Sequence, residues 1–121
     1  MYVYKKEDAL LCVSNSKLEL PKMPEGTVEI TLDGTVDDTR LYKFVDGVVS
    51  IDEEREVSVL NSKLIGLRFD RDQKLKETDW TQLTDIPDSI KAPYAAYRQQ
   101  LRDLPTTITH WKDEVVFPEK P

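Results

Sequence analysis

Few side chains in this sequence have the type and spacing that catalysis or metal binding requires. The only histidine is His110 and the only cysteine is Cys12. No nucleophile or metal-ligand set lies near His110 in the sequence, and the apolar run around Cys12 favours burial of the thiol. A Cys–His dyad formed in space is a minor alternative. We therefore predict no enzyme, no catalytic residue and no cofactor, and one cysteine excludes an intrachain disulfide.

One short segment has a superficial likeness to a calcium-binding loop. Asp70 and Asp72 stand two residues apart, as the first two ligands of such a loop do. However, Lys74 occupies the position of the third oxygen ligand, and Leu75 stands where the sharp turn needs glycine. Glycine-rich phosphate-binding motifs and zinc-ligand spacings are also absent from the sequence. No metal site is therefore predicted.

The charge balance argues against nucleic acid as a partner. With 17 Lys and Arg against 23 Asp and Glu, the formal net charge is −6, whereas phosphate binding needs clustered cations. The acids alternate with Lys and Arg, so a continuous DNA-mimicking face is not expected. No apolar run reaches the ~18 residues of a membrane span, and no signal-peptide pattern is present. We expect the protein to remain in the cytoplasm of the producing cell.

Strands are predicted in the first half of the chain. Short runs rich in β-branched and aromatic residues are separated by turn residues. Asp46-Gly47 between two such runs predicts a hairpin over residues 40–51, because a tight primed turn needs positive φ at both central positions. The predicted strands cover residues 2–4, 9–13, 27–32, 40–45 and 48–51.

The hydrophobic period changes to that of helices in the second half. Leu60, Leu64 and Leu67, followed later by Leu75, recur at spacings that place them on one helical face. The start of this first helix is open, because residues 57–59 could equally extend a strand.

A second helix is predicted from an apolar stripe at spacings of four and three, formed by Ile90, Tyr94, Tyr97, Leu101 and Leu104. Asp88 or Ser89 is the expected N-cap, Pro93 must lie in or just after the first turn, and Pro105 ends the helix. The residues expected to anchor the following tail are Trp111, Val115, Val116 and Phe117.

The expected fold class is therefore α+β. A small N-terminal antiparallel sheet is followed by a C-terminal helical pair and an irregular tail. A chain of 121 residues suits one domain of ordinary size, within which we distinguish a β-rich subdomain, residues 1–56, and a helical module, residues 57–121.

Residues 68–121 resemble the phage tail assembly chaperone family and related tail-fibre assembly and virion proteins. The resemblance is carried by an R-D-x-x-L-x-x-T-D-W-T segment, a D-x-P connection, a Y-R-x-x-L-R-D helix and a Phe-Pro-containing tail. The matching positions are Asp72, Leu75, Asp79, Trp80, Tyr97, Arg98, Leu101, Arg102 and Pro105. The entry to the second helix at 88–93 and the segment 106–110 depart from the family pattern.

The resemblance implies a non-enzymatic protein that binds other tail or tail-fibre proteins and acts during assembly in the host cytoplasm. The alternative is a structural subunit, such as a fibre adaptor or decoration component, that is retained in the mature tail. A homo-oligomer or multi-copy assembly is compatible with either function. A third hypothesis, from a different class, is a small acidic inhibitor of a host enzyme.

Two motif positions have competing interpretations. Trp80 either fills the junction between the helices or is presented to a partner as an interface anchor. Arg98 and Arg102 lie four residues apart, on a shared helix face. They either clamp a carboxylate of the fold, for which the candidates are Asp79, Asp85 and Asp103, or dock a partner.

Overall fold

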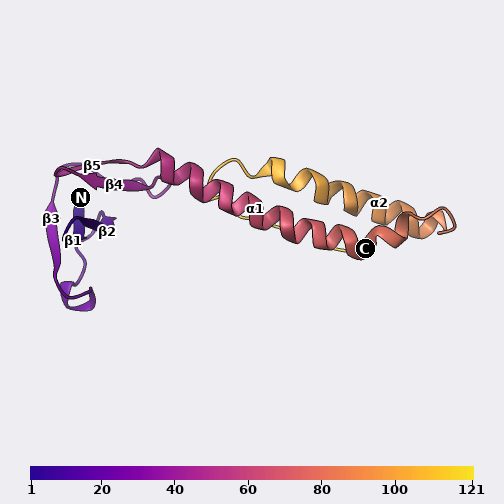
Figure 1. Cartoon of the computed structure of the whole chain (residues 1–121), viewed down its shortest axis with the longest axis horizontal. Coiled ribbons are helices and arrows are strands. Elements are labelled where there is room, and N and C mark those ends of the chain that lie inside the picture. The colour runs from indigo at the N-terminus through magenta and orange to yellow at the C-terminus, as the bar shows by residue number, and fades with distance from the viewer. The chain divides into compact units, whose positions relative to one another are not determined.

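A computed structural model describes all residues from 1 to 121. The chain divides into two compact units, Met1–Glu56 and Val57–Pro121. The first contains the strands and the second contains most of the helical residues (Figure 1). The predicted α+β fold class is confirmed. The assignment of the two parts as separate subdomains stays a prediction.

A three-stranded antiparallel sheet forms the first part of the N-terminal unit. Its strands are β1 (Tyr2–Lys6), β2 (Ala9–Ser14) and β3 (Thr27–Thr31), in the order β2-β1-β3. Val3 and Tyr4 of the central strand are fully buried, and successive strand residues face opposite sides, so both faces of β1 are covered. The Tyr4 hydroxyl accepts the Leu18 N–H at 2.6 Å and donates to Glu29 at 3.1 Å. This tyrosine therefore fixes the β2–β3 connection, which includes a 3-10 turn at Leu20–Lys22.

The predicted hairpin is confirmed. Strands β4 (Tyr42–Val45) and β5 (Val48–Ile51) pair antiparallel, with Val45 opposite Val48. Asp46 has φ 51° and Gly47 has φ 78°. Positive φ at both central residues is the geometry of a type I′ turn, which matches the right-handed twist of the paired strands.

The first helix, α1 (Glu53–Thr78), begins four residues before Val57. Asp52 caps it, because its carboxylate accepts the Arg55 N–H at 3.0 Å and its carbonyl accepts the Glu56 N–H at 3.1 Å. Residues 57–59 are helical, which excludes the strand alternative. Asp52 is therefore both the only residue between the hairpin and the helix and the N-cap of α1.

The second helix, α2 (Asp88–Asp103), corrects the expected N-cap. Pro87 occupies the capping position, and its carbonyl accepts the N–H groups of Ile90 and Lys91. Asp88 lies in the first turn, so neither Asp88 nor Ser89 is the cap. Pro93 lies just after the first turn, as the pattern requires. A 3-10 turn at Leu104–Thr107 containing Pro105 ends the helix.

The core of the helical unit lies between the two helices and the tail. Leu67, Leu104 and Ile108 form a buried cluster. The partly buried residues packed against this cluster are Leu60, Leu64, Val115 and Phe117. Tyr97 is 5% exposed and Leu101 is fully buried, whereas Ile90, at the other end of the predicted stripe, is 39% exposed. The apolar stripe of α2 therefore leaves the core near its N-terminal end.

The tail follows α1 in the same direction. Lys63 donates to the carbonyl oxygens of Trp111 and Asp113, and the Lys74 ammonium lies 5.1 Å from the Phe117 ring centroid. Val115 and Phe117 anchor the tail as predicted, but Val116 is 66% exposed and does not. Alternate residues of an extended segment face opposite ways, which explains why the middle residue of the three points outward.

A polar turn begins this tail. The Asp113 carboxylate accepts the backbone N–H groups of Thr109 and His110, each at 3.0 Å. These two hydrogen bonds favour the ionised carboxylate and lower the pKa of Asp113 below its ordinary value.

Removing the buried Leu101 side chain should destabilise the helical unit. We expect Leu101→Ala to lower the free energy of unfolding by about 2–5 kcal/mol, because it leaves a cavity between well-packed groups. The matched control is Ile65→Ala on α1, whose side chain is 67% exposed. Urea denaturation measures both variants, and equal losses of stability would contradict the assigned core.

The Asp113 turn predicts a dependence of stability on pH. Because the folded pKa is lowered, ionised Asp113 stabilises the turn at neutral pH, and that contribution is lost as pH falls from about 5 to about 2. Over this range the wild type should lose more stability than Asp113→Asn. Glu114→Gln, at an exposed neighbour, is the control and should behave as wild type. Urea midpoints across the range provide the measurement, and parallel curves for wild type and Asp113→Asn would refute this role.

Candidate functional site

Arg98 joins the end of α1 to α2. Its side chain extends from α2, and the residue is 8% exposed. One terminal nitrogen, Nη1, donates to the Leu75 carbonyl at 2.6 Å and to the Thr78 hydroxyl at 2.9 Å. The other, Nη2, donates to the Asp79 carboxylate at 2.8 Å. The guanidinium therefore serves acceptors of the last turn of α1, where free carbonyls and the helix dipole favour a cation.

This arrangement identifies the carboxylate partner that the sequence left open. Arg98 pairs with Asp79, and neither Asp85 nor Asp103 takes part. The Asp79 side chain is 63% exposed against 10% for Arg98, so water screens the ion pair and the bonds to α1 matter more. The Nε atom of Arg98 is buried without a partner. Burial makes Arg98 a residue of the fold, and its alternative interpretation as a partner-docking residue stays a prediction.

The remaining motif residues separate into a buried or half-buried group and an exposed group. Tyr97 and Leu101 are buried in the core, and Leu75 is half-buried while its carbonyl accepts Arg98. Arg102 is exposed and pairs with no carboxylate, so it does not share the clamp. Asp72 is exposed and pairs with its neighbour Arg71 at 3.0 Å. On the face of α2 that the two arginines share, Arg98 is therefore buried, whereas Arg102, one turn later, is exposed to solvent.

Trp80 does not fill the junction between the helices. Its side chain is 51% exposed, its Nε1 donates to the Glu77 carbonyl at 3.1 Å, and its ring lies 6.1 Å from that of Tyr94. A 3-10 turn at Asp79–Gln82 brings the fully buried Thr81 to the inside instead. The Thr81 hydroxyl donates to the Thr78 carbonyl at 2.6 Å.

Thr78 and Thr81 help to hold the junction between the helices together, and the sequence interpretation missed both. Thr78 is 1% exposed and its hydroxyl donates back to α1 carbonyls, as well as accepting Arg98. A small side chain with a hydroxyl can satisfy buried backbone groups where an indole would be too large. The only sequence signal is the spacing of Thr78 and Thr81 on either side of Asp79-Trp80.

The connection between the helices therefore presents an apolar surface. We define the turn-end patch as Trp80, Leu83, Ile90 and Tyr94. Leu83 is 56% exposed and Ile90 is 39% exposed, while Tyr94 is half-buried beneath Trp80. Ile90 and Tyr94 lie four residues apart on α2, so they share one face. The Lys91 ammonium donates to the Leu83 carbonyl at 3.1 Å, which holds the connection against α2.

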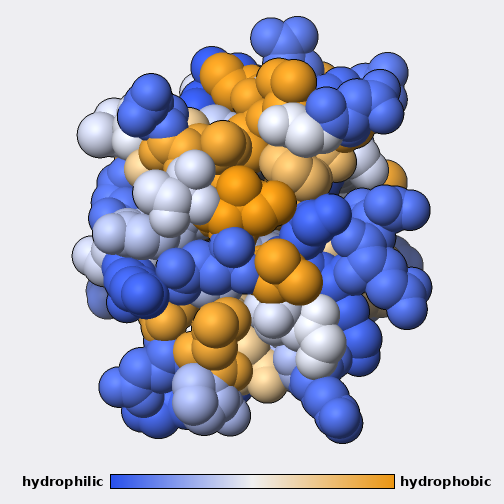
Figure 2. All heavy atoms as spheres, turned by 90° about the vertical axis from the view of Figure 1, so that its left-hand side faces the viewer, coloured by the Kyte–Doolittle hydropathy of each residue, from blue (hydrophilic) through white to orange (hydrophobic).

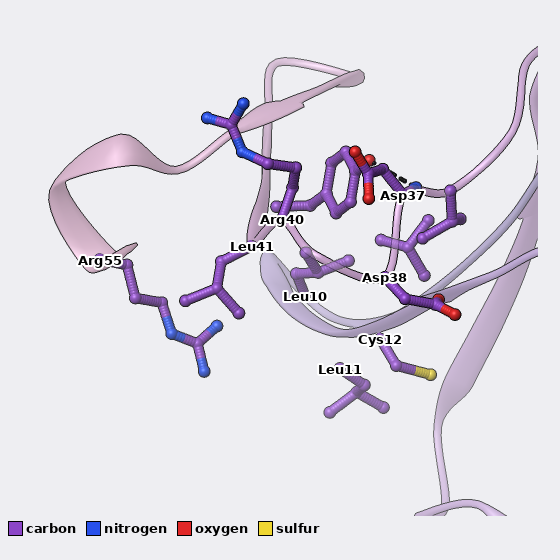
Figure 3. Close-up of a pocket in the computed structure, with 11 residues that line it drawn as sticks. Leu10, Leu11, Cys12, Asp37, Asp38, Arg40, Leu41 and Arg55 are labelled. Atoms are coloured by element: carbon purple, nitrogen blue, oxygen red, sulfur yellow. Dashed lines mark hydrogen bonds between the residues drawn. The ribbon is translucent and has the colours of Figure 1, made fainter. Parts of the chain in front are cut away.

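A separate hollow of ≈ 240 Å³ lies in the N-terminal unit. Figure 3 shows Arg40 turned away from Cys12, with Asp37 and Asp38 beside the hollow. Arg40 makes a two-point contact with Glu56, at 2.9 and 3.1 Å, which raises the pKa of its guanidinium. Burial raises the pKa of the Cys12 thiol, which disfavours the reactive thiolate. Nothing in this hollow selects a ligand or a reaction.

His110 has local contacts only. Its ring lies 5.4 Å from the ring of Trp111, and its Nδ1 accepts the Lys112 N–H at 3.0 Å. No group of three or more His, Cys, Asp or Glu side chains is arranged to hold a metal ion. None of the helices combines the length and apolarity needed to cross a bilayer.

Comparison with known proteins identifies the helical segment. Residues 64–121 match the family described as phage tail assembly chaperone protein. This segment is therefore similar to that family. The chaperone-family segment contains every motif residue on which the resemblance depended, and it starts four residues earlier than the sequence motif suggested. The family's description names phage tail assembly, which makes this the process to consider for the chain.

The remaining comparisons give no relatives. Neither the curated proteins nor the solved structures include a match to this chain.

The Arg98 contacts predict that lysine cannot replace this arginine. We expect Arg98→Lys to lower the free energy of unfolding by about 1–3 kcal/mol, because one ammonium cannot serve the three acceptors that the planar fork reaches. Arg102→Lys, one turn further along the same helix, should change stability by less than about 0.5 kcal/mol. Thermal unfolding of the two variants is the measurement. A neutral Arg98→Lys would show that the clamp contributes nothing.

Proposed function

We propose that this protein binds other proteins of a phage tail or tail fibre and acts in their assembly by binding rather than by catalysis. The single observation that carries the proposal is the family match over residues 64–121. Its assembly site would be the host cytoplasm. Retention in the mature tail as a structural subunit is the outcome to be distinguished by experiment.

The geometry of the chaperone-family segment supports a binding role. Three buried residues, Arg98, Thr78 and Leu101, support the helical pair from inside. The motif tryptophan, by contrast, exposes half of its large apolar surface. Exposed aromatic residues on a rigid support are typical anchors of protein interfaces. The motif therefore combines a framework with a residue available to a partner.

A chaperone of this kind would act by mass action. Binding to a tail protein before assembly lowers the concentration of its free, aggregation-prone form, and the incoming tail component then displaces the chaperone. This mechanism needs an accessible surface and reversible affinity. It does not need a reactive group.

The N-terminal unit offers a different kind of surface. Figure 2 looks onto this end of the chain and shows apolar side chains in patches between hydrophilic ones. Its exposed apolar residues are Leu11, Leu18, Leu20, Val28, Val45, Val48 and Ile51. Exposed apolar side chains are ordinary on soluble proteins and do not by themselves identify a partner for this unit.

The proposal predicts which proteins copurify with the chain. Affinity-tagged protein expressed in infected cells should capture one or more phage tail proteins well above background. A Leu101→Asp variant, which places a charge in the helical core, should lose the capture. Enrichment of a host enzyme with no tail protein would contradict the proposal and favour an inhibitor.

Mass spectrometry of purified particles separates the two forms of the proposal. A transient assembly factor should be absent from mature particles or present far below the copy number of tail subunits. Stoichiometric presence would instead identify a retained structural subunit.

A further inference from the structure

The segment connecting the two helices has one sign of charge. Residues 77–90 contain four acids, Glu77, Asp79, Asp85 and Asp88, and no Lys or Arg. We call these four residues the acidic rim. In residues 64–76 and 102–120 of the chaperone-family segment, by contrast, acids and bases are interspersed, so opposite charges lie close together.

Most of the acidic rim has no cation within the fold. Only Asp79 forms an ion pair, with Arg98, and its side chain remains 63% exposed. Glu77, Asp85 and Asp88 are exposed and make no ion pair. The cations that flank this segment are Lys76, next to Glu77, and Lys91, whose ammonium donates to the Leu83 carbonyl. The rim therefore presents negative charge to solvent.

The turn-end patch lies within the same connection as this charge. Trp80 is adjacent to Asp79, and Leu83 is two residues before Asp85. The indole N–H of Trp80 is already used by the Glu77 carbonyl, so the exposed part of the side chain offers apolar ring surface. An apolar centre flanked by charge of one sign resembles the core and rim of a protein interface.

Another exposed apolar pair in the same unit lacks this pattern. Ile65 and Phe69 of α1 are 67% and 64% exposed. Their neighbours on the helix surface include both Arg68 and Asp72, so no single charge sign surrounds them. Charge complementarity therefore selects a partner for the turn-end patch and not for this pair.

We propose that the turn-end patch binds a basic amphipathic segment of a partner tail protein, with apolar side chains against Trp80 and Leu83 and with Lys or Arg opposite the acidic rim. This inference rests on the proposed function and names the chemistry of its partner. Complementary charge would guide the encounter and set the orientation, while the apolar contacts would hold the complex. A partner segment that is exposed before assembly would lose this chaperone when its own assembly partner covers it.

A site-specific crosslink tests the identity of the occupant. Trp80 is replaced by the photoreactive p-benzoylphenylalanine in the full chain, expressed with the phage's own tail proteins in infected cells. We expect crosslinks to a tail-protein peptide in which apolar residues alternate with Lys or Arg. The same replacement at Ile65 is the control and should give at most weak crosslinks to that peptide.

Other crosslinking results would overturn the inference. Crosslinks from position 80 to a second copy of this chain would identify a self-association surface. Crosslinks only to peptides without an excess of Lys and Arg would remove the role of charge.

Binding measurements with the captured tail protein test the apolar contacts and the acidic charge separately. Trp80→Ala and Leu83→Ala should each weaken binding about tenfold or more, as expected for anchors at an interface centre. Asp85→Asn with Asp88→Asn should also weaken binding, and it should reduce the loss of affinity between about 0.05 M and about 0.5 M NaCl. Glu114→Gln with Glu119→Gln, which removes the same charge from the tail, should leave affinity and salt dependence unchanged.

These outcomes distinguish the two levels of the proposal. Capture of tail proteins by the wild type, with unchanged affinity in the Trp80, Leu83 and double aspartate variants, would overturn the turn-end inference alone. Failure of the wild type to capture any tail protein would overturn the proposed function as well. Unfolding curves of each variant, including the exposed Leu83→Ala, show that lost binding does not reflect lost folding.

Discussion

The helical unit depends on the contact of one buried guanidinium with the end of a long helix. Arg98 reaches the Leu75 carbonyl, the Thr78 hydroxyl and the Asp79 carboxylate within 2.9 Å. The last carbonyls of this helix of 26 residues have no acceptor role within α1 itself. Side chains of Thr78, Trp80 and Thr81 donate to several of them, and Arg98 adds a bond to the Leu75 carbonyl from α2. Arg98 thereby links the end of α1 to the packing of α2.

That constraint determines what the connection exposes. Because Thr78 and Thr81 occupy the buried positions next to Arg98, the indole of Trp80 lies outside, against Tyr94. The acidic residues of the connection are sequence neighbours of an apolar surface that lies between the two helices in the chain. Sites on rigid elements lose little conformational entropy when a partner binds. The motif residues of this chain thus divide into residues that hold the helices together and a tryptophan that is exposed to solvent.

Local patterns predicted most of the fold. Asp46-Gly47 specified the hairpin because its backbone requirements are strict, and the spacing of Tyr97, Leu101 and Leu104 placed the core face of α2. Asp52 was missed as the cap of α1 because it directly follows a strand, so no polar loop signals the boundary. Pro87 takes the capping position because its backbone is extended there, its carbonyl accepts the first helical N–H groups, and no side-chain bond is made.

The candidate site was only partly predictable. A carboxylate partner for Arg98 was foreseen, but the choice among Asp79, Asp85 and Asp103 depends on how far α1 extends, which periodicity does not fix. The orientation of Trp80 was also beyond sequence reasoning, because a large apolar side chain at a junction is usually buried. In the structure, the 3-10 turn at Asp79–Gln82 places the small, fully buried Thr81 at the inside of the junction instead.

The fluorescence of Trp80 tests the central claim most directly. In a Trp111→Phe variant only Trp80 emits, and acrylamide quenching reports its exposure to solvent. The structure predicts red-shifted, readily quenched emission in the free protein and a blue shift with protection when a tail protein binds. Emission that is already blue-shifted and protected in the free protein, or that does not change in the complex, would contradict the account.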